Sequence, residues 1–102
     1  MNMANKKIIL AGGDNMISLV GSLVSKGYTV VAINPDRGSC ARIAECSDVL
    51  VINGDPAVPQ ILKEADAEGA DMVISAMPRD EVNLVVCELC KKQFRVGKTA
   101  AL

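Results

Sequence analysis

Histidine and tryptophan are both absent from this chain of 102 residues. Histidine is the commonest general base and the commonest metal ligand in proteins. Without it, the chain cannot build the Ser–His or Cys–His pair of a hydrolase from its own residues. Hydrolases of these two kinds are therefore excluded.

Aromatic rings and excess positive charge are also scarce. Tyr28 and Phe94 are the only aromatic residues, and the formal net charge at pH 7 is −1. Binding of single-stranded nucleic acid relies on stacking rings, and binding of duplex DNA relies on a basic surface. We therefore expect no nucleic-acid partner.

Long apolar runs are missing too, since no run approaches the roughly 20 residues of a membrane-spanning helix. The first residues, 1–7, lack the long apolar segment and the cleavage site of a signal peptide. We expect a cytoplasmic protein. Half of the residues are hydrophobic, which favours one folded domain over 1–102 with an aliphatic core.

Short apolar runs alternate with segments of helical periodicity along the chain. The expected strands are 6–10, 28–33, 49–52, 71–76 and 98–102, and the expected helices are 14–26, 36–46, 59–67 and 79–94. This alternation indicates an α/β fold with a parallel sheet that is buried on both faces. The prediction is a three-layer, Rossmann-like, doubly wound sheet with strand order 3-2-1-4-5.

The loops at the carboxyl ends of such strands form the ligand site of this architecture. The first loop resembles a dinucleotide fingerprint, G-x-G-x-x-G, only weakly: Ala11 and Met16 replace two glycines and Gly13 is retained. Gly12 adds backbone freedom. We expect Asp14 to cap the following helix, where its charge would oppose a phosphate.

The second loop follows the second strand, where a carboxylate about 20 residues beyond the fingerprint usually binds the adenosine ribose. Here the strand ends at Asn34, which can bond a hydroxyl but less strongly than a charged group. Arg37 follows on the next turn. Its side chain either meets a phosphate or remains a solvated helix residue.

Three short motifs in the second half of the chain are more specific. Gly54–Asp55 follows the third strand, Ala70–Ile74 forms an "ADMVI" run, and Asp80–Leu84 reads D-E-x-N-L. In order and spacing they resemble the RCK/KTN domain, also called the TrkA amino-terminal domain. The resemblance extends from Lys6 to about Lys92.

The resemblance implies a regulatory module, not an enzyme, that binds NAD/NADH or an adenine nucleotide (ATP, ADP or AMP). It also implies a homodimer or ring that acts with a membrane-embedded potassium transporter or channel subunit, at the inner face of the membrane. By position, the cofactor-binding residues would be Ala11, Gly12, Gly13, Asp14, Asn15, Asn34, Asp55, Ser75, Ala76 and Met77, to which we add Arg37. We expect these 102 residues to form a single domain without the family's carboxyl-terminal lobe.

Two other functions stay open at this point. The departures from the fingerprint favour a degenerate module that acts only in dimerisation, through the last helix and the open sheet edge. A nicotinamide-dependent oxidoreductase is a third choice, with no catalytic acid–base group to support it. The C-x-x-C at Cys87 and Cys90 lies in mid-helix, on the opposite sheet face from Cys40 and Cys46. We therefore expect core cysteines and no metal site.

Overall fold

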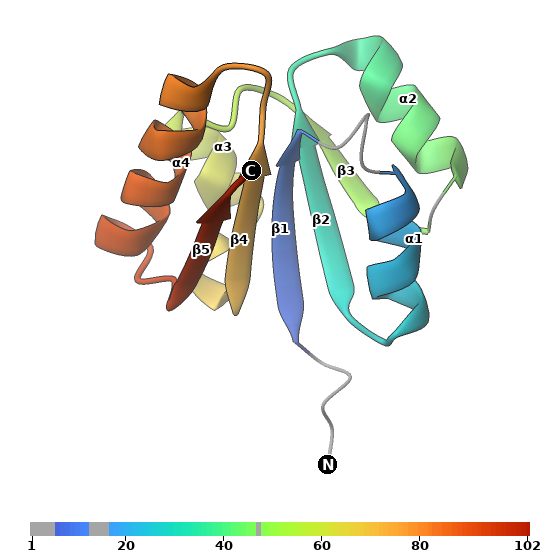
Figure 1. Ribbon diagram of the computed structural model, residues 1–102, viewed down its shortest axis with the longest axis horizontal. Coiled ribbons are helices and arrows are strands. Elements are labelled where there is room, and N and C mark those ends of the chain that lie inside the picture. The colour runs from blue at the N-terminus through green and yellow to red at the C-terminus, as the bar shows by residue number, and fades with distance from the viewer. Residues whose placement is uncertain (1–5, 13–16, 47) are drawn as a thin grey trace.

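The computed structural model of the protein describes residues 6–12, 17–46 and 48–102 (Figure 1). In chain order, the elements are β1 (Lys7–Gly12), α1 (Ile17–Ser25), β2 (Thr29–Asn34), α2 (Arg37–Cys46), β3 (Leu50–Asn53), α3 (Pro59–Glu64), a 3-10 turn (Ala67–Gly69), β4 (Met72–Ala76), α4 (Asp80–Lys92) and β5 (Lys98–Ala101). All strand pairs are parallel, in the order β3-β2-β1-β4-β5. The predicted Rossmann-like, doubly wound α/β fold is confirmed.

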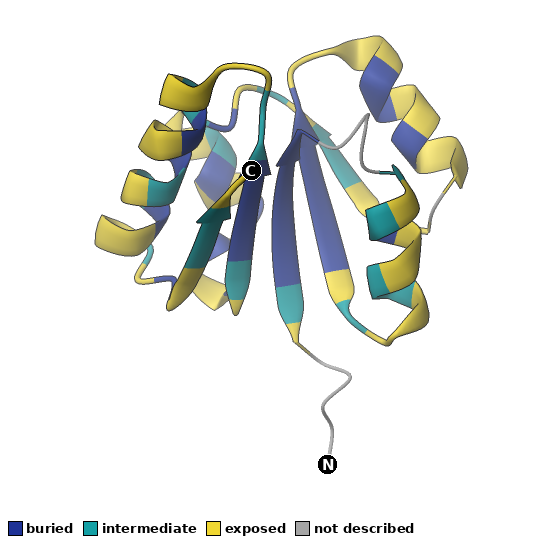
Figure 2. Cartoon of the chain, in the orientation of Figure 1, coloured by how far each residue is buried: buried dark blue, intermediate teal, exposed yellow. Residues whose placement is uncertain are grey.

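Successive strand residues point to opposite faces of the sheet, and each face buries its own apolar cluster. Ile9, Val31 and Val73 pack with Leu62 of α3 and Val86 of α4. Ile8, Leu10, Val30 and Ile74 pack with Val20 of α1 on the other face. Figure 2 shows buried residues concentrated in the three central strands and on the inner sides of the helices. This packing explains why the strands are near-continuous apolar runs.

The boundaries of two helices reflect left-handed backbone positions. Gly27 has φ of 93° and follows α1, as expected for a residue that ends a helix. The third helix was expected to continue to residue 67, but it ends at Glu64. Asp66 then adopts φ of 58°, and a separate 3-10 turn follows. A residue in this conformation cannot continue a right-handed helix.

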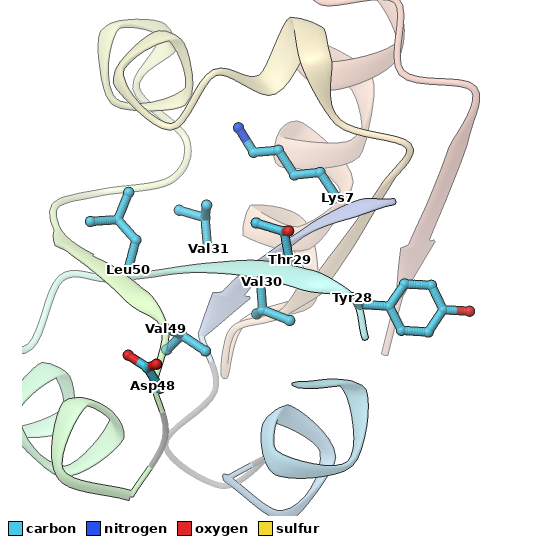
Figure 3. A pocket seen from close by; sticks show the side chains of 8 residues that line it. All are labelled: Lys7, Tyr28, Thr29, Val30, Val31, Asp48, Val49 and Leu50. Atoms are coloured by element: carbon cyan, nitrogen blue, oxygen red, sulfur yellow. The ribbon is translucent and has the colours of Figure 1, made fainter. Parts of the chain in front are cut away.

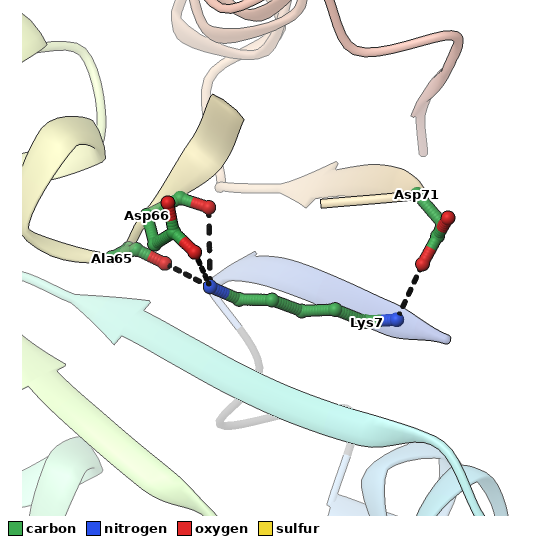
Figure 4. A network of polar contacts seen from close by, with 4 residues as sticks. All are labelled: Lys7, Ala65, Asp66 and Asp71. Carbon is green, nitrogen blue, oxygen red and sulfur yellow. Dashed lines mark hydrogen bonds and ion pairs between the residues drawn. The ribbon is translucent and has the colours of Figure 1, made fainter. Parts of the chain in front are cut away.

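Lys7 joins the start of β1 to the end of α3 (Figure 4). Its Nζ donates hydrogen bonds to the backbone oxygens of Ala65, at 2.6 Å, and of Asp66, at 3.1 Å. Nζ also lies 3.4 Å from a carboxylate oxygen of Asp66. The backbone N–H of Lys7 donates to Asp71 at 2.7 Å. The Asp66 oxygen also accepts from Gly69 N at 3.1 Å. Lys7 is therefore the donor to the Ala65 carbonyl, which the end of a short helix leaves without an intrahelical partner.

None of the helices in the described residues is long and apolar enough to cross a lipid bilayer.

Replacing Lys7 with Met should lower the free energy of unfolding by about 1–3 kcal/mol, because the Ala65 carbonyl loses its donor and the Asp66 carbonyl keeps only Gly69 N–H, while the side-chain volume is kept. Urea denaturation measures the change. Lys6→Met, at the exposed neighbouring residue, is the matched control and should change stability by less than about 0.5 kcal/mol. Equal effects of the two variants would contradict the role assigned to Lys7.

Candidate functional site

The carboxyl ends of β1 and β4 approach each other closely at the centre of the sheet. Gly12 is paired with Ala76 in the strand register, and its φ is 100°. A Cβ added at Gly12 would lie 2.6 Å from the carbonyl oxygen of Ala76. Gly12 is therefore required by both backbone conformation and space. The chain leaves β1 and β4 for opposite faces of the sheet here, so this is the switch point of the fold.

The predicted phosphate-binding loop is only partly within the described residues. Ala11 is fully buried in β1, and Gly12 ends that strand. Gly13, Asp14 and Asn15, together with Met16, lie outside the described residues. Their roles in phosphate binding, and the capping role of Asp14, stay predictions.

Asn34 ends β2 and shapes the turn that follows it. Its side chain is 7% exposed, and its Oδ1 accepts a hydrogen bond from the backbone N–H of Asp36 at 2.8 Å. Its backbone oxygen accepts from Gly54 N at 3.0 Å and from Asn53 Nδ2 at 3.1 Å. Asn53 Nδ2 also donates to Pro35 O at 3.0 Å. Side chains from two neighbouring strands therefore hold this turn in place.

Asp36 caps the amino terminus of α2. Its Oδ2 accepts hydrogen bonds from the backbone N–H of Ser39 at 2.8 Å and from the Ser39 hydroxyl at 2.9 Å. Such a cap satisfies a backbone donor that the first turn leaves without a partner. Arg37 is the first residue of α2 and is exposed. Within the described part of the chain, its side chain makes no hydrogen bond or ion pair.

Asp55 follows β3 in a tight turn. Its Oδ1 accepts from the backbone N–H of Ala57 at 2.9 Å, an arrangement typical of aspartate in turns. Gly54 precedes it against α3, where an added Cβ would lie 2.7 Å from Cδ1 of Ile61. Packing against Ile61 therefore favours glycine at position 54, and the turn favours aspartate at position 55. The Asp55 side chain is exposed at this end of the sheet.

Asn83 fixes the loop between β4 and α4, and sequence reasoning did not place it in the site. Its side chain is 1% exposed. Its Oδ1 accepts from the Ser75 hydroxyl at 2.6 Å and from the backbone N–H of Met77 at 2.8 Å. Its Nδ2 donates to the carbonyl oxygen of Met77 at 3.0 Å. An asparagine among the apolar residues of a buried helix face was the signal available in the sequence.

The clamp made by Asn83 determines what the β4–α4 loop can offer a ligand. Both backbone polar groups of Met77 are bonded to Asn83, and the hydroxyl of buried Ser75 is bonded there too. The groups left to face a ligand are the half-buried side chains of Ala76 and Met77. This loop therefore contributes an apolar wall rather than hydrogen-bond donors.

The fold brings the predicted residues that are described to one edge of the sheet. Ala11 and Gly12 end β1, Asn34 ends β2, and Asp55 follows β3. Ser75 and Ala76 end β4, with Met77 directly after them. Since parallel strands end on the same side, these residues share the edge at which ligands bind in this architecture. That each one contacts a nucleotide stays a prediction.

A pocket of about 560 Å³ lies at the opposite end of the sheet (Figure 3). Its lining residues are Lys7, Tyr28, Thr29, Val30, Val31, Asp48, Val49 and Leu50. They come from the starts of β1, β2 and β3 and from the segments before β2 and β3. This hollow is separate from the predicted site.

The cysteines do not form a redox or metal centre in the described residues. Cys40 and Cys90 are buried, and Cys87 is half-buried. They lie on α2 and α4, on opposite faces of the sheet. Burial, with a smaller contribution from Cys87, raises the pKa of the Cys90 thiol to about 11, so its reactive thiolate is disfavoured. The expectation of core cysteines was wrong for Cys46, which is exposed at the end of α2. No cluster of three or more Cys, Asp or Glu suited to a metal occurs within 6–12, 17–46 and 48–102.

The TrkA-N domain model matches residues 8–102. A Trk system potassium uptake protein TrkA homolog of Methanothermobacter thermautotrophicus is 34% identical over 94 residues, which cover 92% of this chain and 43% of that protein. The Trk system potassium uptake protein TrkA of Haemophilus influenzae is 30% identical over 84 residues, which cover 82% of this chain and 18% of that protein. The chain therefore spans less than half the length of these two relatives.

Two solved structures share the fold. The GsuK channel bound to NAD superposes with a TM-score of 0.81 at 17% identity, over 98% of this chain and 18% of that chain. The NAD(P)-binding domain of an exopolyphosphatase-related protein from Archaeoglobus fulgidus has a TM-score of 0.78 at 20% identity, over 93% of this chain and 71% of that chain. At these identities, the superpositions establish the Rossmann-like architecture.

Replacing Asn83 with Leu should destabilise the protein by about 2–4 kcal/mol, because Ser75 and both backbone groups of Met77 lose their partner in a buried place. The more specific readout is amide hydrogen exchange, in which the Met77 N–H should lose its protection. Ser75→Ala is the control, since it removes one bond and leaves the Met77 contacts. Undiminished protection of Met77 in Asn83→Leu would contradict the clamp.

Proposed function

The chain belongs to the TrkA-N domain family, and we propose that it is a regulatory nucleotide-binding module of a potassium transporter or channel system. The observation that carries this proposal is the meeting of Gly12, Asn34, Asp55 and Met77 at the switch edge of the sheet. The relatives named for Trk potassium uptake support the potassium system, and the NAD-bound GsuK channel supports NAD or NADH as the ligand.

A regulatory role fits the chemistry of this edge better than catalysis does. The described polar side chains here are largely engaged in holding the loops: Asn83 binds Met77, Asp36 caps α2, and Asp55 accepts from Ala57. A dehydrogenase needs a general acid or base placed against its substrate. A module that changes shape or assembly when a nucleotide binds needs only the binding surface, with the membrane-embedded subunit as its partner.

Titration calorimetry with NADH, NAD, ATP, ADP and AMP tests the proposal. We expect micromolar binding of at least one of the five, with NAD or NADH among the binders. Asp55→Asn should weaken it about three- to tenfold, because the Asx turn to Ala57 survives while the charge facing the adenine side is lost. Asp71→Asn, at the opposite end of the sheet, is the matched control. No heat with any nucleotide at millimolar concentration would overturn the proposal.

A second candidate function, assembly, is favoured by one stripe of α4 that we call the α4 seam: Asp80, Leu84, Cys87 and Lys91. Spacings of four, three and four residues place these side chains on one side of the helix. Leu84 is 65% exposed and Cys87 is half-buried. Val85, the residue after Leu84, is 46% exposed, so exposed apolar surface adjoins the seam, and such surface can mark a contact with another protein.

The charges of the α4 seam suit a second copy of this chain. Arg79 pairs with Glu81, and Glu88 pairs with Lys92 at 2.7 Å, which lowers the pKa of the Glu88 carboxyl. Asp80 and Lys91, by contrast, make no ion pair with any described residue. In an antiparallel pair of α4 helices related by a two-fold axis, Asp80 of each copy faces Lys91 of the other, and Leu84 faces Cys87. A two-fold contact must be self-complementary in this way.

Charge exchange tests this homodimer. Asp80→Lys should raise the dimer dissociation constant about tenfold, because two attractive contacts become repulsive. Adding Lys91→Asp to this variant should bring the dimer dissociation constant back to the wild-type value. Sedimentation equilibrium measures both. Glu45→Lys on α2 makes the same charge change away from the seam and should have no effect. If the wild-type chain stays monomeric up to roughly 100 µM, the homodimer is excluded, because a small specific interface should assemble below that concentration.

A further inference from the structure

The turn after β2 offers a ligand hydrogen-bond donors and no free acceptor. Asn34 is more than nine-tenths buried, and its Oδ1 is already bonded to the N–H of Asp36. Its Nδ2 makes no hydrogen bond to another described residue. A buried amide donor without a partner is costly unless a ligand or water accepts its hydrogen bond. Within residues 6–12, 17–46 and 48–102, the group left over at this position is therefore a donor that lacks an acceptor.

The one acid within the turn is not free to bind sugar hydroxyls. The carboxylate of Asp36 accepts from both the N–H and the hydroxyl of Ser39. In NAD-binding sites, a free carboxylate at the end of this strand accepts hydrogen bonds from the ribose hydroxyls. That acceptor has no counterpart in the turn from Asn34 to Arg37.

Cationic and dipolar groups lie directly beside the Asn34 amide. Arg37 is exposed, makes no hydrogen bond or ion pair with another described residue and begins the 10-residue helix α2. The first turn of a helix presents backbone N–H groups without intrahelical partners and carries partial positive charge. A guanidinium near the end of β2 is the usual means of accommodating a phosphate on the ribose 2′ oxygen.

We propose that the turn formed by Asn34 and Arg37 recognises the 2′-phosphate of a 2′-phosphorylated adenine dinucleotide, so that the module prefers NADP(H) to NAD(H). Asn34 Nδ2 donates to a phosphate oxygen, and Arg37 supplies the opposing charge. The preference rests on the proposed nucleotide-binding function and names the ligand class of that same site. It follows from the neutral residue at the end of β2 and from the engagement of Asp36 by Ser39.

Parallel titrations with NADP+ and NAD+, which differ only in the 2′-phosphate, test the preference at one fixed ionic strength. We expect NADP+ to bind the wild-type chain more tightly than NAD+. Arg37→Gln should weaken NADP+ binding about tenfold, as expected for loss of a charge-assisted bond, and leave NAD+ binding within about twofold. Lys63→Gln, which removes one exposed positive charge from α3, is the control and should change neither.

A second variant tests the same turn in the opposite direction. Asn34→Asp keeps an oxygen to accept from Asp36 N–H and restores the carboxylate that binds ribose hydroxyls. It should invert the preference, with NADP+ weakened about tenfold or more by charge repulsion and NAD+ strengthened. Its unfolding curve, compared with that of the wild type, shows that the fold is retained.

The outcomes separate this inference from the function on which it rests. If NAD+ binds and NADP+ binds no more tightly, or if Arg37→Gln leaves NADP+ binding unchanged, the 2′-phosphate preference is overturned and the nucleotide-binding function stands. If neither dinucleotide nor any adenine nucleotide binds at millimolar concentration, both proposals fall together.

Discussion

The parallel pairing of β1 with β2 on one side and with β4 on the other is the constraint on which the rest of the structure depends. It buries β1 between two strands and between two helix layers. It also brings the ends of β1 and β4 so close that Gly12 has no room for a side chain beside Ala76. The loops that follow β2, β3 and β4 leave the sheet at this edge, and each carries residues of the candidate site. The position of the candidate site therefore follows from the strand order alone, whatever side chains the loops carry.

The loops after β2, β3 and β4 are held by side chains that take up most of their polar groups. Asn83 occupies both backbone groups of Met77, Asn53 supports the turn after Asn34, and Asp36 caps α2. A rigid edge of this kind costs a ligand little ordering entropy. It also leaves few groups available, and those few define specificity. Among the described residues, the groups left over are the Asn34 amide, the Arg37 guanidinium, the exposed Asp55 carboxylate and an apolar wall at Met77.

The outer side of α4 is chemically separate from that edge. Its inner side contributes Asn83 to the loop clamp and Val86 and Cys90 to the core. The α4 seam on its outer side carries an exposed leucine between two charges of opposite sign. One helix therefore connects the loop that would contact a nucleotide to the surface that would contact a second copy. A ligand that shifted the β4–α4 loop would act on both, because Asn83 lies in the first turn of the same rigid element.

Much of this protein could be predicted from the sequence, because hydrophobic periodicity and turn residues are local signals. The alternation of apolar runs and helical segments predicted the strand order, and Gly27 predicted the end of α1. The role of Asn83 could not be predicted, because its partners Ser75 and Met77 belong to another element and the bonds exist only after α4 packs on β4. The same holds for Lys7, whose partners Ala65 and Asp66 lie far along the chain. The sequence by itself determined the architecture and the edge that carries the candidate site. Only the tertiary structure decided which polar groups there are already bonded and which remain for a ligand, because hydrogen bonds between distant segments leave no periodic trace in the order of residues.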